Sequence, residues 1–390
     1  MIRHATVVDQ TQRGELASGA FEDGASASRD VVEIEVVQHG RASIARKAHV
    51  ELYRVDPEIE TGLEFRDRVL WRLRRHSAMG HDPERQVRLL RGYSDAMHVG
   101  AVLPQLEIGT DPEAIARYAR TVEELGYDHV VIFDHVLGAH PDRPGGWSGP
   151  YDHRSMFHEP FVLYGYITGV TTHLRLATAV IVLPQRQTAL VAKQAAEVDV
   201  LSRGRLILGV GIGWNEVEYE ALGMRFTDRG RRIEEQIAVM RALWTEDVVD
   251  FKGRWHRIDR AGLNPPPVQR PIPVWMGGGW DRRARNVVEP ALRRIARIAD
   301  GWFTHLPPDE DGRAGMKAFR HFVQDAGRDP TKVPVEGRVQ AAHGGPEEWK
   351  RGIEAFRAMG MTSVELTTMG AGYRTVDEHL EALGQFRRLV

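Results

Sequence analysis

The chain has 390 residues, a formal net charge of -2 and 42% hydrophobic residues, which is enough apolar sequence for a large globular core. It contains no cysteine, so disulfides, thiolate catalysis and cysteine-ligated metal centres are excluded. The near-neutral, interspersed charge argues against nucleic-acid binding. The sequence also lacks a secretory signal and any apolar run of roughly 18 residues that could span a membrane. We therefore expect a cytoplasmic protein.

Residues 1–96 do not follow the pattern of the rest of the chain. VVEIEVVQ (31–38) is compatible with a strand and FRDRVLWRLRRH (65–76) with a basic helix, but neither pattern recurs. We interpret residues 1–96 as a non-barrel N-terminal extension that is poorly ordered or translated from an upstream start. Met97 directly precedes the first strand of the repeating pattern, which fits the second idea. A small accessory domain is the alternative.

From His98 onward, short β-like runs alternate with helical patterns. The predicted strands cover residues 98–105, 129–134, 174–184, 205–213, 271–278, 301–305, 333–341 and 363–369. Helices are predicted near 111–125, 188–202 and 228–245, from 281, and near 312–326, 346–359 and 376–389. Eight predicted strands in about 290 residues, seven of them followed by a predicted helix, predict an α/β fold, a (β/α)8 TIM barrel, for residues 97–390.

Two polar residues end the second predicted strand, in the run VVIFDHV. Catalytic groups of such barrels lie at the carboxyl ends of the strands, which is where Asp134 and His135 fall. Imidazole can serve as a general acid or base near neutral pH, and a carboxylate can orient it. A polar strand end that only caps backbone groups explains the pair equally well, so both interpretations stay open.

Two connections are longer than plain turns. Residues 137–158 combine glycine, proline, histidine and aromatic residues, which is typical of a lid or substrate loop. Residues 247–270 contain three consecutive prolines and are more typical of scaffold. The loop histidines His140, His153 and His158 lack the His-x-His pair of metal-dependent barrel hydrolases, so no metal site is expected.

Glycines alternate along the fourth predicted strand at Gly209, Gly211 and Gly213. A missing side chain lets a flat ring or another backbone approach closely, although it can equally relieve crowding inside a barrel. Trp214 and Asn215 follow the last glycine, so the spacing is not that of a dinucleotide-binding loop.

Three further glycines, Gly277, Gly278 and Gly279, end the fifth predicted strand. Asp281 is a plausible N-cap for the helix predicted to follow. Bare amides at a helix N-terminus favour a phosphate, and Arg282 and Arg283 could add charge-assisted contacts. A tight turn from strand to helix is the alternative, but its place at the carboxyl end of a strand favours phosphate.

Several motifs together resemble the bacterial-luciferase-like superfamily, and more narrowly its F420-dependent oxidoreductase branch. They are ATAVIVLP, AAEVDVLSRGRLILGVGIGWNEVEYEALGM, RFTDRGRRIEEQIAVMRALWTED, GLNPPPVQRPIPVWMGGG and IARIADGW. The resemblance covers residues 97–390 in family order. It implies a (β/α)8 barrel that binds FMN or the deazaflavin F420 at the carboxyl ends of its strands, and members are commonly dimers.

The resemblance also implies roles for individual residues. Asp134 would lie against the ring system of the cofactor, with His135 beside the hydride-transfer centre as proton donor or orienter. The third strand of the family bulges under the flavin, sometimes with a non-prolyl cis peptide, and the matching residues are Ala179 and Val180. Residues that would flank the cofactor or hold its phosphate are Gly211, Gly213, Asn215, Gly277, Gly278 and Gly279.

The choice of cofactor rests on the residues after the second strand. FMN-using members more often have a Glu-His-His type sequence there, whereas this chain has Asp-His-Val, which favours F420. Trp214 stands where sugar-phosphate dehydrogenases of the family have a glutamate, so that substrate is not carried over. We expect an F420-dependent oxidoreductase acting on an unidentified organic substrate. The alternatives are an FMNH2-dependent monooxygenase and a non-catalytic flavin-binding protein.

Overall fold

The structure is a computed structural model that describes residues 97–390 and, of the preceding residues, only the backbone of short strands. The chain divides into two units, Met1–Gly92 and Tyr93–Val390. In the first unit, β5 (Asp30–Val36), β6 (Arg46–Leu52) and β7 (Trp71–Leu73) form an antiparallel sheet. Two small antiparallel pairs are β1 (Arg3–Ala5) with β4 (Gly19–Phe21) and β2 (Val8–Asp9) with β3 (Gly14–Glu15).

The predictions for this first unit have mixed outcomes. The strand predicted over residues 31–38 is confirmed for residues 31–36. The helix predicted over residues 65–76 is wrong at Trp71–Leu73, because these residues pair with β6 as a strand. The rest of that prediction, and the expected poor order of residues 1–96, lie outside the described residues.

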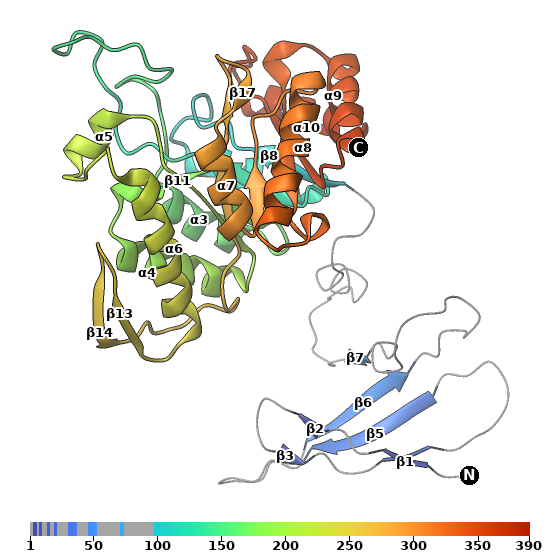
Figure 1. Cartoon of the computed structure of the whole chain (residues 1–390). Helices are drawn as coiled ribbons and strands as arrows, with labels where there is room; N and C mark the ends of the chain where they lie inside the picture. Colours follow the sequence, from blue (N-terminus) through green and yellow to red (C-terminus); the bar gives the residue numbers. More distant parts are fainter. Residues whose placement is uncertain are drawn as a thin grey trace. The chain divides into compact units, whose positions relative to one another are not determined.

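A closed barrel of eight parallel strands forms the second unit, as the sequence predicts (Figure 1). Each strand pairs with the next along the chain, and the last pairs with the first. The strands are β8 (His98–Val102), β9 (His129–Ile132), β10 (Arg175–Thr178) continued by β11 (Ile181–Val182), β12 (Leu206–Gly211), β15 (Val274–Gly277), β18 (Gly301–Phe303), β19 (Val335–Gln340) and β20 (Ser363–Thr367). The third strand is interrupted between β10 and β11, where the Ala179–Val180 peptide is cis.

Helices follow the strands and cover the outside of the barrel (Figure 1). They are α2 (Pro112–Glu124), α3 (Pro160–Val170), α4 (Thr188–Ser202), α5 (Glu216–Ala221), α6 (Arg229–Thr245), α7 (Glu289–Ile298), α8 (Glu310–Asp325), α9 (Pro346–Ala358) and α10 (Val376–Arg387). Capping residues mark several starts: Asp111 accepts from the amide of Glu113, and Thr375 forms a capping box with Glu378. The helix predicted from 281 begins only at Glu289.

Two hairpins replace segments for which no hairpin was predicted. In 247–270, β13 (Val249–Lys252) pairs with β14 (Arg257–Ala261) ahead of the proline run. After the triple glycine, β16 (Trp280–Asp281) pairs with β17 (Asn286–Val287), so Asp281 is not a helix N-cap. Its carboxylate accepts from the amides of Arg283 and Ala284, which is the bonding pattern that an N-cap and a turn share.

Alternation along each strand divides the barrel core into an outer and an inner part. The larger apolar cluster packs between the strands and the helices. The inner cluster is Val102, Val131, Ala177, Ile207, Trp275 and Phe303, with Phe133, Ala179, Val180 and Met369 partly buried against it. Among the described residues, no helix is both long and apolar enough to cross a bilayer.

Charged and polar side chains also lie inside the barrel. His129 Nε2 on β9 is 3.0 Å from Glu336 Oε1 on β19, and the Ser363 hydroxyl donates to Glu336 Oε2 at 2.5 Å. Burial alone would lower the pKa of His129, but the contact with Glu336 raises it overall. A Cβ at Gly100 would lie 2.3 Å from His129 Nε2, so this glycine makes room for the imidazole.

The fourth-strand glycines relieve crowding against neighbouring protein atoms. A Cβ at Gly209 would lie 1.7 Å from the carbonyl oxygen of Thr178. At Gly211 it would lie 2.5 Å from Val180 Cγ2, and at Gly213 it would lie 2.5 Å from Val182 Cγ1. Protein atoms therefore occupy the space of a Cβ at all three positions, which fits the interpretation that these glycines relieve crowding inside the barrel.

We predict that Gly209→Ala lowers the free energy of unfolding by about 2 kcal/mol or more, because a methyl group has no space between adjacent strands. Gly165→Ala in α3 is the control, since a Cβ there meets no atom within 4 Å. It should be neutral or stabilise the helix by about 0.5 kcal/mol. Urea unfolding followed by tryptophan fluorescence measures both; equal stability of the two variants would contradict the prediction.

Candidate active site

A cavity of about 1340 Å³ opens at the carboxyl ends of the barrel strands. We call it the main cavity. Its walls come from the residues after β9, from the bulge between β10 and β11, from the start of α5 and from the β16–β17 hairpin. The loop predicted to form a lid contributes Arg143 and residues 145–151, so it does line the cavity. Figure 1 shows this loop beside α5 at one end of the barrel.

Asp134 is buried at the cavity wall with 3% of its surface exposed. Its carboxylate accepts from Arg186 Nη2 at 2.7 Å, from Arg186 Nε at 3.2 Å and from the backbone amide of Val182 at 2.9 Å. Burial by itself would lower the pKa of Arg186, but Asp134 raises it overall, so this guanidinium stays charged. Asp134 therefore fixes the residues around β11. It does not orient His135, so the sequence interpretation in which this carboxylate holds the imidazole is wrong.

His135 is oriented by a glutamate that the sequence analysis did not single out. Its Nδ1 lies 3.0 Å from Oε1 of Glu218, whose side chain is only 1% exposed. Glu218 lies in α5, a short helix capped by Asn215, which accepts from the amide of Val217. With Nδ1 engaged, the second ring nitrogen of His135 is the one available to a molecule in the cavity.

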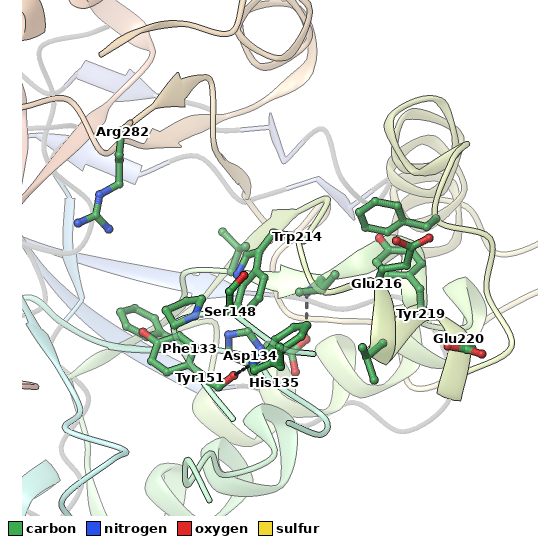
Figure 2. A pocket seen from close by; sticks show the side chains of 18 of the residues that line it. Phe133, Asp134, His135, Ser148, Tyr151, Trp214, Glu216, Tyr219, Glu220 and Arg282 are labelled. Carbon is green, nitrogen blue, oxygen red and sulfur yellow. Dashed lines mark hydrogen bonds between the residues drawn. The ribbon is translucent and has the colours of Figure 1, made fainter. Parts of the chain in front are cut away.

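Aromatic rings surround His135 (Figure 2). Ring centroids lie 4.6 Å away for Phe157, 5.1 Å for Tyr151 and 5.6 Å for Trp214. Trp147 from the lid loop stacks on Trp214 at 5.7 Å. Aromatic faces on one side of the cavity favour a flat, apolar partner and keep water from the imidazole.

The predicted cofactor residues fall into two groups. Those that line the main cavity are Asp134, His135, Ala179, Val180 and Gly213. Those that do not line it are Gly211, Asn215, Gly277, Gly278 and Gly279. The residues of the second group can therefore affect the cavity only through the residues that line it.

Two glycines of that second group support the bulge of the third strand. A Cβ at Gly277 would lie 2.6 Å from Val180 Cγ1, and the one at Gly211 would also meet Val180. These two glycines let Val180 reach the position from which it lines the cavity. Gly278 has φ +112° and its carbonyl accepts from Trp302 Nε1, and no helix N-terminus follows directly. The phosphate prediction thus loses the helix amides on which it partly rested.

A positively charged side faces the aromatic one. Arg282 and Arg283 from the hairpin, and Arg338 from β19, line the cavity together with His305. Figure 2 shows Arg282 well apart from the group around His135 and Tyr151. His305 is exposed to the cavity, and partial loss of solvent there, together with Arg338 and Arg282, lowers its pKa. His305 is therefore neutral at physiological pH while the arginines carry the charge.

Arg338 is held by a buried acid that the sequence analysis also missed. Its Nε contacts Glu365 Oε1, and its guanidinium lies 4.7 Å from the centroid of the Phe133 ring. Burial and Glu336 raise the pKa of Glu365, although Arg338 acts in the opposite direction. Arg338 thus contacts the buried Glu365 inside the barrel and also lines the cavity.

These residues fit a planar redox cofactor with an anionic tail. The cavity is larger than a typical ligand pocket of 300–1,000 Å³, so ring and substrate can share it. Ala179 and Val180 supply an apolar surface and His135 a proton-transfer group. Arg282 and Arg283 supply positive charge that suits a phosphate.

We predict that His305 stays neutral from pH 8 down to pH 6.5, because its surroundings in the cavity wall and the nearby Arg338 and Arg282 lower its pKa. Its imidazole resonance in a carbon–proton correlation spectrum should not move over this range. The variant His305→Gln assigns the signal. A His305 resonance that shifts with a midpoint near 6.5 would contradict the prediction.

Known proteins resemble this chain in sequence and in fold. It is 34% identical over 239 residues to uncharacterized protein Mb0978c of Mycobacterium bovis, which is 60% of this chain and 80% of that protein. It is 33% identical over 177 residues to the FMNH2-dependent dimethylsulfone monooxygenase of Pseudomonas fluorescens, covering 43% of this chain and 46% of that protein. The F420-dependent tetrahydromethanopterin reductase of Methanopyrus kandleri has a similar fold, with a TM-score of 0.58 at 16% identity over 75% of this chain and 98% of that one.

A family model gives the broadest match. The model of luciferase-like monooxygenases matches residues 75–387, which include the whole barrel. The match begins upstream of residue 97, the predicted start of the barrel domain. With the closed barrel, the bulged third strand and the cavity at the carboxyl ends of its strands, the chain belongs to the luciferase-like monooxygenase family, and it is an oxidoreductase of that family.

Proposed function

We propose that this protein is an F420-dependent oxidoreductase that transfers hydride between the deazaflavin and an organic substrate. The observation that carries the proposal is a histidine held by a buried carboxylate at the wall of a large, partly aromatic cavity. The sequence Asp134-His135-Val136 after the second strand supports F420 over FMN, by its resemblance to the F420-using branch. The fold shared with an F420-dependent reductase is compatible with the same choice.

His135 would handle the proton that accompanies the hydride. When a carbon bearing a hydroxyl gives up a hydride, the hydroxyl proton must also leave, and the reverse reaction must return it. The free ring nitrogen of His135 would take or return that proton, while Glu218 holds Nδ1 and stabilises the charged imidazole. A bound deazaflavin would supply the hydride acceptor or donor.

The other residues would position the reactants. Asp134 and Arg186 tie the end of β9 to the start of α4 and so fix the wall on which the ring would lie. Ala179 and Val180 would support the ring, and Trp214 would lie against the organic substrate. Arg283 and the turn at Gly277–Gly279 remain our candidates for the phosphate of the cofactor.

The second candidate is an FMNH2-dependent monooxygenase. The similarity to the dimethylsulfone monooxygenase of Pseudomonas fluorescens favours it, because that protein is FMNH2-dependent by name. In that case the chemistry with oxygen would belong to the bound flavin. The aromatic wall would keep bulk water away from the flavin.

Cofactor preference is tested by titrating the full-length protein with F420 and FMN in parallel and following absorption and fluorescence. We expect tighter binding of F420, and loss of its oxidised absorption band when a substrate is found. Oxygen consumption with FMNH2, together with weak F420 binding, would support the second candidate. Binding without turnover over a broad substrate panel would contradict both.

We predict that His135→Ala lowers turnover by about 100-fold or more, the usual range for loss of a general acid or base, with a much smaller change in cofactor affinity. Glu218→Gln should lower turnover less, because the amide can still accept a hydrogen bond from Nδ1. His321→Ala, at an exposed position of α8, is the control and should match the wild type. Equal losses of turnover and cofactor affinity in His135→Ala would assign His135 a positioning role instead.

A further inference from the structure

A second, smaller cavity of about 550 Å³ adjoins the main cavity. We call it the side chamber. The two share Phe133, Tyr151, Arg282, His305 and Arg338 in their walls, so these residues form a common partition. The apolar part of its own wall is Trp280, Leu306, Pro307, Pro308, Val339, Trp349, Phe356 and Met369. Its volume suits a small organic molecule or one end of a larger one.

The three arginines of the side chamber differ in how many acidic side chains they are paired with. Arg285 is paired with Asp309 and Asp311. Arg338 is held through Nε by Glu365, which leaves its terminal nitrogens free of ion pairs within residues 97–390. Arg282 forms no ion pair with any residue of that same range. The partition therefore presents two guanidinium groups with unused hydrogen-bond donors.

The acidic side chain in the wall does not offset this charge. Glu348 is the wall's only acid among the described residues, and its carboxylate accepts from the amide of Gly345 and from Arg351. His305, on the partition, is neutral. Arg282 is exposed and solvated in the empty chamber, so an uncharged ligand would displace that water without replacing it, whereas an anion would provide a counter-charge.

A hydroxyl group in the wall is an independent sign of a missing partner. Thr367 is 6% exposed, and its Oγ1 has no hydrogen-bond partner among the described residues. It follows Glu365 by two positions on β20, so both side chains point to the interior of the barrel. The oxygen itself is closed off from the chamber that Thr367 lines, so a rotation of the side chain would be needed to present the hydroxyl to a ligand, where it would gain the partner it lacks.

We propose that the side chamber binds the oxyanion of the substrate, a carboxylate, sulfonate or phosphate on an otherwise apolar molecule. Arg282 would balance its charge and the terminal nitrogens of Arg338 would donate hydrogen bonds to it, as would the Thr367 hydroxyl once its side chain turns toward the chamber. The apolar body would lie against Phe133 and Tyr151 on the partition and extend toward His135 in the main cavity. That the bound anion belongs to the substrate rests on the proposed function. The presence of an anion site does not.

Benzoate and benzamide are the probes, because they have nearly the same shape and differ in charge. Binding to the full-length protein is measured by calorimetry and tryptophan fluorescence, first without cofactor and then with F420 or FMN bound. We expect benzoate to bind at least about 10-fold more tightly than benzamide, as charge-assisted hydrogen bonds require. Equal affinity of the two probes would overturn the proposal.

Three variants locate the site without touching the buried Arg338–Glu365 pair. Arg282→Met should weaken benzoate binding by about 10-fold or more, and Thr367→Val by about 3- to 10-fold, while benzamide binding stays unchanged. Arg283→Met is the matched control, because Arg283 lines the main cavity but not the side chamber. It should keep the benzoate affinity of the wild type.

The same variants separate an anion on the substrate from an anion on the cofactor. If Arg282→Met weakens F420 or FMN binding and leaves benzoate binding intact, the side chamber serves the cofactor and our proposal is wrong. If benzoate binds as described but neither F420 nor FMN binds, the anion site stands and the proposed function fails. Benzoate binding that neither Arg282→Met nor Thr367→Val weakens would also overturn the proposal.

Discussion

Closure of eight parallel strands into a barrel is the constraint on which the whole site depends. All strands end at the same rim, so residues far apart in the chain meet there as soon as the barrel closes. Glu218 and His135 are 83 positions apart, and Asp134 and Arg186 are 52 apart, yet each pair is in direct contact. The glycines of β12 and β15 complete the rim by giving the third-strand bulge room to turn inward.

The cavity therefore has two chemically different sides. His135 lies among aromatic rings, in surroundings that suit proton transfer away from bulk water. Arg282, Arg283 and Arg338 lie on the other side and suit anions. The proposed hydride transfer between a cofactor and an organic substrate would use both, since charge fixes the position of a molecule whose reacting part is apolar. The neutral His305 adds no charge to the cationic side.

Much of the fold could be predicted from sequence because strand and helix patterns are local. The barrel, most helix bounds, the place of Asp134 and His135 at a strand end and the lining role of the loop after β9 all follow from such patterns. α3 was missed because PFVLYGYITGV is apolar on all sides and has no helical periodicity. The prediction of Asp281 as an N-cap was wrong, because an aspartate carboxylate accepts from the same backbone amides in a turn as it does at the start of a helix. Glu218 could not be told from Glu216 and Glu220 without knowing which side of α5 faces the barrel.

The most direct test of the account is a crystal structure of the full-length protein soaked with F420. We predict that the ring lies in the main cavity against Ala179 and Val180, with a ring nitrogen of His135 facing the bound molecule and Glu218 still on its Nδ1. A ring bound at the opposite end of the barrel, or a main cavity that is filled by the loop after β9 and excludes the ring, would contradict it.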